Sequence, residues 1–144
     1  MFSNSTKYAI RTIVYLSQKE AGHKCTVEEI AADLDIPKPY LSKVLQQLSK
    51  ADLISSLKGR GGGFYLTTEN KRRNLIDVVI CMDGKNVFNQ CLLGLPQCNE
   101  KNPCLLHSEF KKFKSGLEKS VVKKSINKLI EEWASNDSNS LEKD

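Results

Sequence analysis

Residues 26–66, TVEEIAADLDIPKPYLSKVLQQLSKADLISSLKGRGGGFYL, begin with the pattern of two short helices. Thr26 and Glu29 form a capping box, in which each side chain satisfies a free backbone N–H at a helix start. Pro37 disfavours helical backbone at Ile36, so the first helix ends there and a second runs over about residues 38–50. The second helix repeats apolar residues at helical spacing, and its predicted inward positions are Leu41, Val44, Leu45 and Leu48.

The outward face of the second helix is polar, basic and rich in amides. A helix that reads DNA needs such a face, because base edges and phosphates are recognised through hydrogen bonds and charge. Two short helices joined by a tight turn therefore predict a helix-turn-helix, although an ordinary amphipathic helix pair fits the same pattern. The candidate DNA contacts on this helix are Lys38, Tyr40, Ser42, Lys43, Gln46 and Gln47.

The following residues, LISSLKGRGGGFYLTT, predict a β-hairpin with strands at 53–57 and 64–67 and a glycine-rich tip between them. Glycines supply the positive φ angles of a tight turn and allow close approach to another molecule. A phosphate-binding loop would end in Gly-Lys-Ser/Thr and open onto a helix, and this tip does neither. A basic hairpin directly after a helix-turn-helix is the wing of a winged helix, which lies along phosphates or a minor groove. Its candidate DNA contacts are Lys58, Arg60, Gly61 and Gly62.

Composition and charge agree with a small DNA-binding protein. The chain has 144 residues and a net charge of +5, and residues 36–73 hold eight basic side chains against two acidic ones. Such a local field suits DNA or RNA, although a solvated basic face gives the same count. No apolar run approaches the roughly 18 residues of a membrane span and no secretory signal is evident, so we expect a cytoplasmic protein with reduced thiols. Without a Ser/His/Asp set or paired carboxylates, we expect no enzyme.

Helices are also predicted on both sides of this segment. One covers about residues 6–19, and KRRNLIDVVICMDG after the wing predicts another. An apolar stripe over residues 107–134 predicts one continuous helix of about 28 residues, roughly 40 Å long. Because such a helix outgrows a domain this small, we expect its stripe to pack on a second copy in a homodimer. The last ten residues, 135–144, are polar and predicted to be disordered.

Three of the five cysteines and one of the two histidines lie in CLLGLPQCNEKNPCLLH, residues 91–107. The spacing Cys-x6-Cys-x5-Cys-x2-His lacks the paired knuckles of structural zinc sites. Because the cysteines are separated by five or six residues, the loop can wrap around an object larger than one zinc ion, such as an iron–sulfur cluster. The ligands of such clusters are thiolates and, in some centres, an imidazole. Zinc in a Cys3His site and a metal-free thiol switch remain alternatives. The candidate ligands are Cys91, Cys98, Cys104 and His107, and Cys25 and Cys81 are assigned no role.

Taken together, these segments resemble the Rrf-type family of bacterial winged-helix regulators, whose members include the IscR and NsrR regulators. The resemblance covers about residues 1–134 and rests on TKYAIRTIVYLS, on the winged helix, above all KGRGGGFYL, and on the cysteine loop. It implies a homodimer that binds palindromic operator DNA and holds an iron–sulfur cluster. It further implies that DNA binding changes with the cluster, as in a sensor of redox, iron–sulfur or nitric oxide status.

The same resemblance implies a set of ligands. Cys91, Cys98 and Cys104 match the family's cluster thiolates, although the first gap is one residue longer than the usual five. His107 matches the histidine that completes a 2Fe–2S cluster in IscR-like members. NsrR-like members instead take a carboxylate from the partner's first helix, where this chain has Lys7, a poor ligand. The resemblance therefore favours a 2Fe–2S over a 4Fe–4S cluster.

The expected fold is mainly α with a small β-hairpin. We expect a winged helix-turn-helix DNA-binding domain at residues 1–85, a cluster-binding loop at 86–107, a dimerisation helix at 108–134 and the disordered tail. Two alternatives remain open. One is the same fold with structural zinc or a thiol switch, and the other is a cytosolic metal- or redox-handling protein without specific DNA binding.

Overall fold

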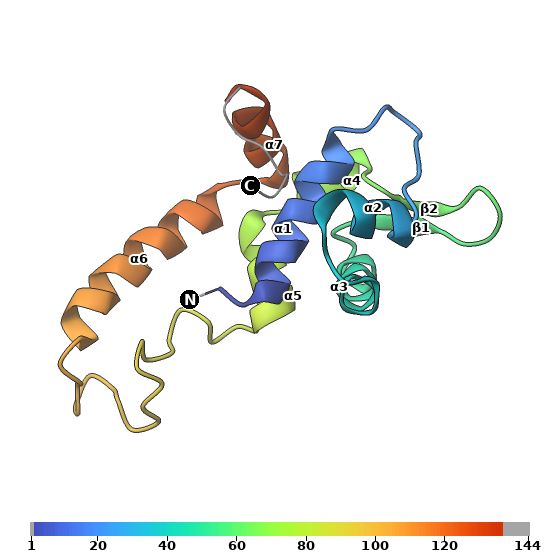
Figure 1. Cartoon of the computed structure of the whole chain (residues 1–144). Coiled ribbons are helices and arrows are strands. Elements are labelled where there is room, and N and C mark those ends of the chain that lie inside the picture. Colours follow the sequence, from blue (N-terminus) through green and yellow to red (C-terminus); the bar gives the residue numbers. More distant parts are fainter. Residues whose placement is uncertain (1, 137–144) are drawn as a thin grey trace.

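The computed structural model describes residues 2–136, which form seven helices and one two-stranded antiparallel sheet (Figure 1). Within these residues every helix is too short or too polar to span a lipid bilayer. Most of the predicted disordered tail lies outside the described residues. In chain order the elements are α1 (Asn4–Ser17), α2 (Val27–Leu34), α3 (Lys38–Lys50), β1 (Ser55–Leu57), β2 (Gly63–Tyr65), α4 (Thr68–Arg72), α5 (Leu75–Asp83), α6 (His107–Lys123) and α7 (Ile126–Ala134).

Helices α2 and α3 form the predicted helix-turn-helix and pack on each other and on α1. The capping box at the start of α2 is present: Thr26 Oγ1 accepts from the Glu29 N–H at 3.2 Å, and Glu29 Oε2 accepts from the Thr26 N–H at 2.8 Å. Asp35, in left-handed backbone, ends α2. The core between these helices is mainly apolar and includes Ile30, Leu34, Leu41, Leu45 and Leu48.

The hairpin of β1 and β2 forms the wing, with Ser55 opposite Tyr65 and Leu57 opposite Gly63. Its strands are shorter than predicted, because Leu53 and Ile54 turn into the core instead of pairing. The base of the wing is tied to the α1–α2 loop by two backbone hydrogen bonds between Cys25 and Phe64, at 2.8 and 2.9 Å. Gly63 has a φ of 148°, and a side chain there would come within 2.6 Å of the Cys25 carbonyl oxygen. Only glycine therefore suits this position.

Asn70 in α4 fastens the base of the wing to α3 and α4. Its side chain is buried and makes three hydrogen bonds, each of 2.9 Å. Its amide oxygen accepts from the Ser55 hydroxyl and the Thr67 N–H, and its amide nitrogen donates to the Asp52 carbonyl. One side chain thereby joins the end of α3, the first strand of the wing and the start of α4.

Replacing Asn70 by alanine is expected to lower the free energy of unfolding by about 2–3 kcal/mol, because it leaves buried backbone groups without partners. Urea denaturation of the full chain measures this change. Asn127→Ala is the matched control, since Asn127 is exposed on α7 and bonds only Glu131 there. That control should change stability by less than about 0.5 kcal/mol. Equal effects of the two substitutions would contradict the role given to Asn70.

Two helices that were predicted to be continuous are each interrupted. The backbone at one interruption hydrogen-bonds to the backbone at the other. The segment after the wing divides into α4 and α5, and the helix expected over residues 107–134 divides into α6 and α7. The Leu75 N–H donates to the Lys124 carbonyl at 2.9 Å, and the Ile126 N–H donates to the Arg73 carbonyl at 2.8 Å. Backbone groups used in this way cannot continue a helix. The prediction of a single 28-residue helix was therefore wrong.

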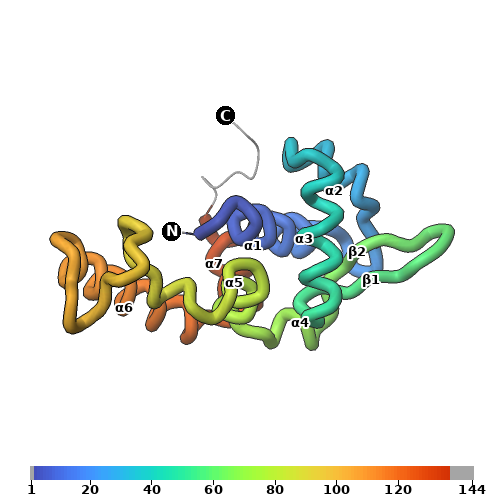
Figure 2. The backbone as a smooth tube through the Cα atoms, turned by 90° about the horizontal axis from the view of Figure 1, so that it is seen from below, coloured from blue at the N-terminus to red at the C-terminus, as the bar shows by residue number. Residues whose placement is uncertain are grey.

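The two halves of that segment have different surroundings. Ile126 at the start of α7 is fully buried, and α7 packs against α1 and α4. Helix α6 extends away from the winged helix, and the wing and α6 lie at opposite ends of the molecule (Figures 1 and 2). Of its 17 residues only Val121 is buried, while Phe113 is 56% exposed. The predicted apolar stripe of α6 is thus only partly covered in the single chain, with Phe113 exposed and Phe110 and Leu117 half-buried.

Candidate DNA-binding surface and cysteine site

A groove of about 800 Å³ lies between α3 and the wing. Five of the predicted DNA contacts line it, namely Tyr40, Lys43, Gln46, Gln47 and Lys58. A groove with amide side chains on its α3 wall and ammonium groups on both walls can form hydrogen bonds to bases and contacts to phosphates. The structure thus brings the predicted recognition helix and the start of the wing tip to one surface.

The other predicted contacts lie around this groove. Lys38 pairs with Glu28, its Nζ 2.6 Å from Oε1, and Ser42 is half-buried on α3. Arg60, Gly61 and Gly62 form the wing tip beyond the groove lining, where Arg60 is exposed. Sequence reasoning missed four polar residues that do line the groove, namely Ser5, Ser49, Lys50 and Ser56. Ser56 lines the groove because β1 pairs with β2, and no local sequence pattern predicts that position.

Tyr40 on α3 is held by α1. Its hydroxyl lies 2.8 Å from Ser5 Oγ, and its ring meets Tyr8 edge-on with 5.4 Å between centroids. The side chain is still 40% exposed at the groove. The first turn of α1 therefore sets the direction of a predicted DNA contact, a role of Ser5 and Tyr8 for which the sequence holds no signal.

The cysteine loop joins α5 to α6, at the end of the molecule opposite the wing (Figure 1). Cys91, Cys98 and Cys104 are free, half-buried thiols. Their three sulfur atoms lie within 4.8 Å of one another, and those of Cys91 and Cys104 are 3.8 Å apart. Thiols separated by up to 12 residues in the chain thus converge on one point, as ligands of a common metal or cluster would.

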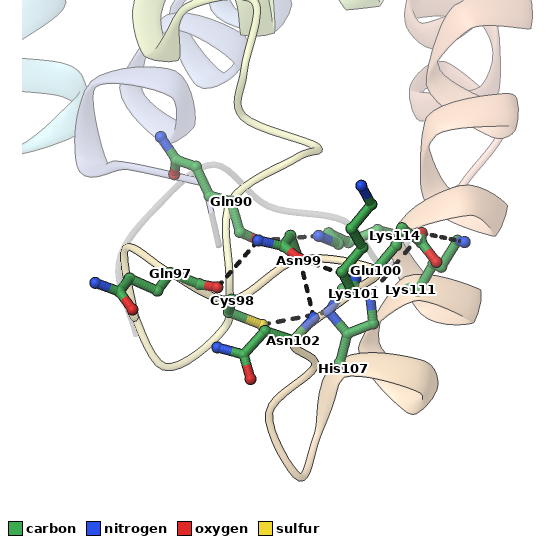
Figure 3. Close-up of polar contacts among 10 residues, drawn as sticks. All are labelled: Gln90, Gln97, Cys98, Asn99, Glu100, Lys101, Asn102, His107, Lys111 and Lys114. Carbon is green, nitrogen blue, oxygen red and sulfur yellow. Dashed lines mark hydrogen bonds and ion pairs between the residues drawn. The ribbon is translucent and has the colours of Figure 1, made fainter.

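His107 is the first residue of α6 and completes the predicted set. Its Nδ1 atom lies 3.3 Å from Cys98 Sγ (Figure 3). Cys104 precedes it by three residues, and the Cys104 carbonyl accepts from the His107 N–H at 3.1 Å. The structure therefore places the imidazole beside Cys98, at the edge of the three-sulfur group, while the ligand atoms that all lie within 4.8 Å of one another are those of the three cysteines.

The thiols of this site differ in acidity. The pKa of Cys91 is lowered to about 7, chiefly because the backbone N–H of Leu95 hydrogen-bonds to its sulfur. At Cys98 the backbone N–H of Cys104 acts in the same direction, but desolvation and the neighbouring thiols outweigh it and raise the pKa. Metals and iron–sulfur clusters bind the thiolate form, so a site with one readily ionised thiol is poised to begin binding. The donor set fits a thiophilic metal or cluster.

In the metal-free protein, alkylation of Cys91 is expected to reach half its maximal rate near pH 7 and to fall at lower pH, because only the thiolate reacts. Cys98 should require more alkaline pH, since its pKa is raised. Mass spectrometry after timed iodoacetamide treatment measures each site separately. Cys98 reacting at lower pH than Cys91 would contradict these surroundings.

Cys25 and Cys81 lie outside this site. Cys25 is fully buried in the core, and burial raises its pKa. Its sulfur lies within 4.8 Å of ligand atoms of His23 and Glu29, but an oxygen of Glu29 is engaged in capping α2. Cys81 on α5 is half-buried, its sulfur lies 3.5 Å from the Gln47 carbonyl, and burial raises its pKa.

Known proteins with similar sequences are transcriptional regulators. The Rrf2 family, described as an iron-dependent transcriptional regulator, matches residues 2–132. A protein of Aquifex aeolicus described as an HTH-type transcriptional regulator is 33% identical over 132 residues, which cover 90% of this chain and 91% of that one. The HTH-type transcriptional regulator NsrR of Bacillus licheniformis is 28% identical over 104 residues, which cover 72% and 69%.

Structural comparison agrees on the fold. The structure of CymR, the global cysteine regulator of B. subtilis, superposes with a TM-score of 0.70 at 16% identity and covers 92% of this chain and 97% of that one. The predicted fold class, mainly helical with a two-stranded wing, is thereby confirmed. The family match extends over nearly the whole described chain and is to regulators rather than enzymes. This chain belongs to the Rrf2 family of DNA-binding transcriptional regulators.

Proposed function

We propose that this regulator is a homodimer that senses redox, iron–sulfur or nitric oxide status through an iron–sulfur cluster. The ligands would be Cys91, Cys98, Cys104 and His107, and the state of the cluster would set the affinity for a palindromic operator. The observation that carries this proposal is the convergence of the three sulfurs within 4.8 Å in a chain of this family.

Two features favour a 2Fe–2S over a 4Fe–4S cluster. The four ligands form two contact pairs, Cys91 with Cys104 and Cys98 with His107, which suits two ligands on each of two irons. Lys7, which stands where NsrR-like members offer a carboxylate, is exposed on α1 and would repel a metal ion. A bound cluster would supply a centre that electrons, oxidants or nitric oxide can modify. The protein would hold the cluster through the four ligands and shield it from solvent.

The uncovered apolar side of α6 supports the homodimer. Phe110 and Phe113 stack on each other with 6.1 Å between centroids, and Phe113 and Val122 remain largely exposed. Packing α6 against α6 of a second copy would bury this surface and set two winged helices side by side. We therefore retain residues 1–85 as the DNA-binding domain and 86–107 as the cluster loop. Within 108–134 we assign dimerisation to α6, because α7 packs on its own chain.

On DNA, α3 would enter the major groove and the wing tip would follow the neighbouring phosphates or groove. The protein's own groove between α3 and the wing is lined by Tyr40, Lys43, Gln46, Gln47 and Lys58. Arg60 is exposed at the wing tip. Two such units related by a twofold axis require half-sites about one helical turn, or a small multiple of it, apart.

The first residues of the chain offer a route from the cysteine loop to α3. Phe88, just before the loop cysteines, packs its ring edge-on against Phe2, with 6.4 Å between centroids. Asp83 at the end of α5 accepts hydrogen bonds from the backbone and hydroxyl of Ser3. Ser5 in turn contacts Tyr40 on α3. A change in the loop could thereby shift a DNA contact, but it acts as a switch only if the two states bind DNA differently.

Zinc is the second candidate, and one distance favours it. Zinc–thiolate bonds of about 2.3 Å place two sulfurs of a tetrahedron about 3.8 Å apart, the separation found between Cys91 and Cys104. A Cys3His zinc site would make the loop structural and leave sensing to another signal.

Anaerobic purification followed by visible absorbance and metal analysis separates the two. The proposal predicts a coloured protein with about two iron and two sulfide ions per chain. A colourless protein with one zinc per chain and no sulfide would contradict it.

A further inference from the structure

The two ring nitrogens of His107 have different surroundings (Figure 3). Nδ1 faces the thiols, 3.3 Å from Cys98 Sγ. Nε2 is buried and has no hydrogen-bond partner within the described residues. The acidic group beside it is the Glu100 carboxylate, whose Oε1 lies 3.9 Å away. One side of the ring is therefore offered to a metal, and the other side points toward a negative charge.

The carboxylate of Glu100 is itself held in place from two directions. Lys111, one turn after His107 on α6, pairs its ammonium group with Glu100 Oε1. The turn that carries Glu100 is closed by Asn99, whose side-chain oxygen accepts from the N–H groups of Lys101 and Asn102 at 2.8 and 2.9 Å. Both restraints keep the carboxylate on the Nε2 side of the imidazole. They also link the loop to α6 independently of any metal.

We propose that Glu100 is a positioning residue that makes Nδ1 the metal-binding atom of His107. A neutral imidazole carries one proton, and a carboxylate beside Nε2 holds that proton there and leaves the Nδ1 lone pair facing the cysteines. The 3.9 Å separation between Nε2 and Oε1 exceeds a hydrogen bond, so the carboxylate favours the proton on Nε2 through its negative charge. This inference rests on the proposed role of His107 as a ligand.

The tautomer of His107 can be measured without any cluster. Only two histidines are present, so His23→Gln leaves the His107 ring as a single ¹⁵N signal set. At about pH 8, above the usual titration range of histidine, long-range ¹H–¹⁵N spectra of the metal-free protein should show mainly the Nε2–H form. Glu100→Ala should move the population toward Nδ1–H. A wild-type ring that is mainly Nδ1–H, or a ring that Glu100→Ala leaves unchanged, would overturn the proposal.

Cluster retention supplies the second readout. In protein reconstituted with iron and sulfide, Glu100→Ala should release iron to a chelator about 10-fold faster than wild type, the lower end of effects seen for outer-shell partners of ligands. Glu118→Gln is the matched control, because Glu118 on α6 lines the same small pocket as Glu100 and His107 but forms no ion pair with the ring within the described residues. Equal release rates for Glu100→Ala and wild type would also overturn the proposal.

The two failures can be told apart. If wild-type protein binds no cluster, the proposed function fails, while the tautomer spectra still decide the role of Glu100. If wild type holds its cluster and Glu100→Ala behaves as wild type in both measurements, the carboxylate is only part of a surface ion pair with Lys111.

Discussion

Replacing Cys98 by serine is expected to remove the iron–sulfur cluster, leaving less than about a tenth of the wild-type iron and sulfide, because a serine hydroxyl does not ionise to a soft ligand near neutral pH. Cys98 is the sulfur that contacts His107, and it lies within 4.8 Å of the other two. Its loss therefore breaks the Cys98–His107 pair and leaves three of the four proposed ligands. Absorbance, iron and acid-labile sulfide measured after anaerobic purification give the result.

The fold should survive this substitution, because Cys98 lies in the loop and is not part of the hydrophobic core. Thermal unfolding of metal-free samples should therefore coincide for variant and wild type. Cys81→Ser is the matched control, since Cys81 is a half-buried thiol outside the loop, and it should keep the full cluster. Full cluster content in Cys98→Ser, or equal loss in Cys81→Ser, would refute the proposed ligand set.

The double substitution Lys43→Ala, Arg60→Ala is expected to weaken operator binding by at least about 100-fold and to reduce the slope of log affinity against log salt by about 4, because each of the two subunits loses two cations. Lys43 stands on the groove face of α3 and Arg60 on the wing tip, so the pair removes one cation from each element that meets DNA. Both side chains are exposed, and the fold should be unaffected. Fluorescence anisotropy with the promoter upstream of its own gene, at several salt concentrations, measures both quantities.

A control pair with the same change of charge is Lys123→Ala, Lys128→Ala. These lysines are exposed on α6 and α7, away from the groove. They should lower affinity only slightly, through the long-range field. Equal losses for the two pairs would show that net charge, rather than the α3 and wing surface, carries binding.

The winged helix was predictable because its signals are local. The Thr26–Glu29 capping box, the proline after α2 and the apolar spacing of α3 each act within a few residues, and all appear in the structure. The glycines of the wing were equally informative. Gly63 is required because the Cys25 carbonyl lies against it. The four candidate ligands were found in the same way, as a dense cluster of soft donors in one loop.

What the sequence could not predict depends on contacts between distant segments. Residues 107–134 have a helical pattern throughout. The helix is nevertheless divided, because the backbone of Arg73 and Leu75 forms hydrogen bonds with that of Ile126 and Lys124. The contact of Ser5 with Tyr40 and the approach of Glu100 to His107 likewise join residues whose neighbourhood only the fold creates. Propensity and periodicity describe one segment at a time, so such pairings stay invisible to them.

The central claim, that the cysteine loop controls DNA binding, is tested most directly by one comparison. The affinity for the promoter upstream of its own gene is measured anaerobically, on a single preparation, before and after the cluster is removed with chelator. A coupling between the two sites predicts that the Kd differs by at least about 10-fold between the forms. The same Kd for two folded, dimeric forms would contradict the claim.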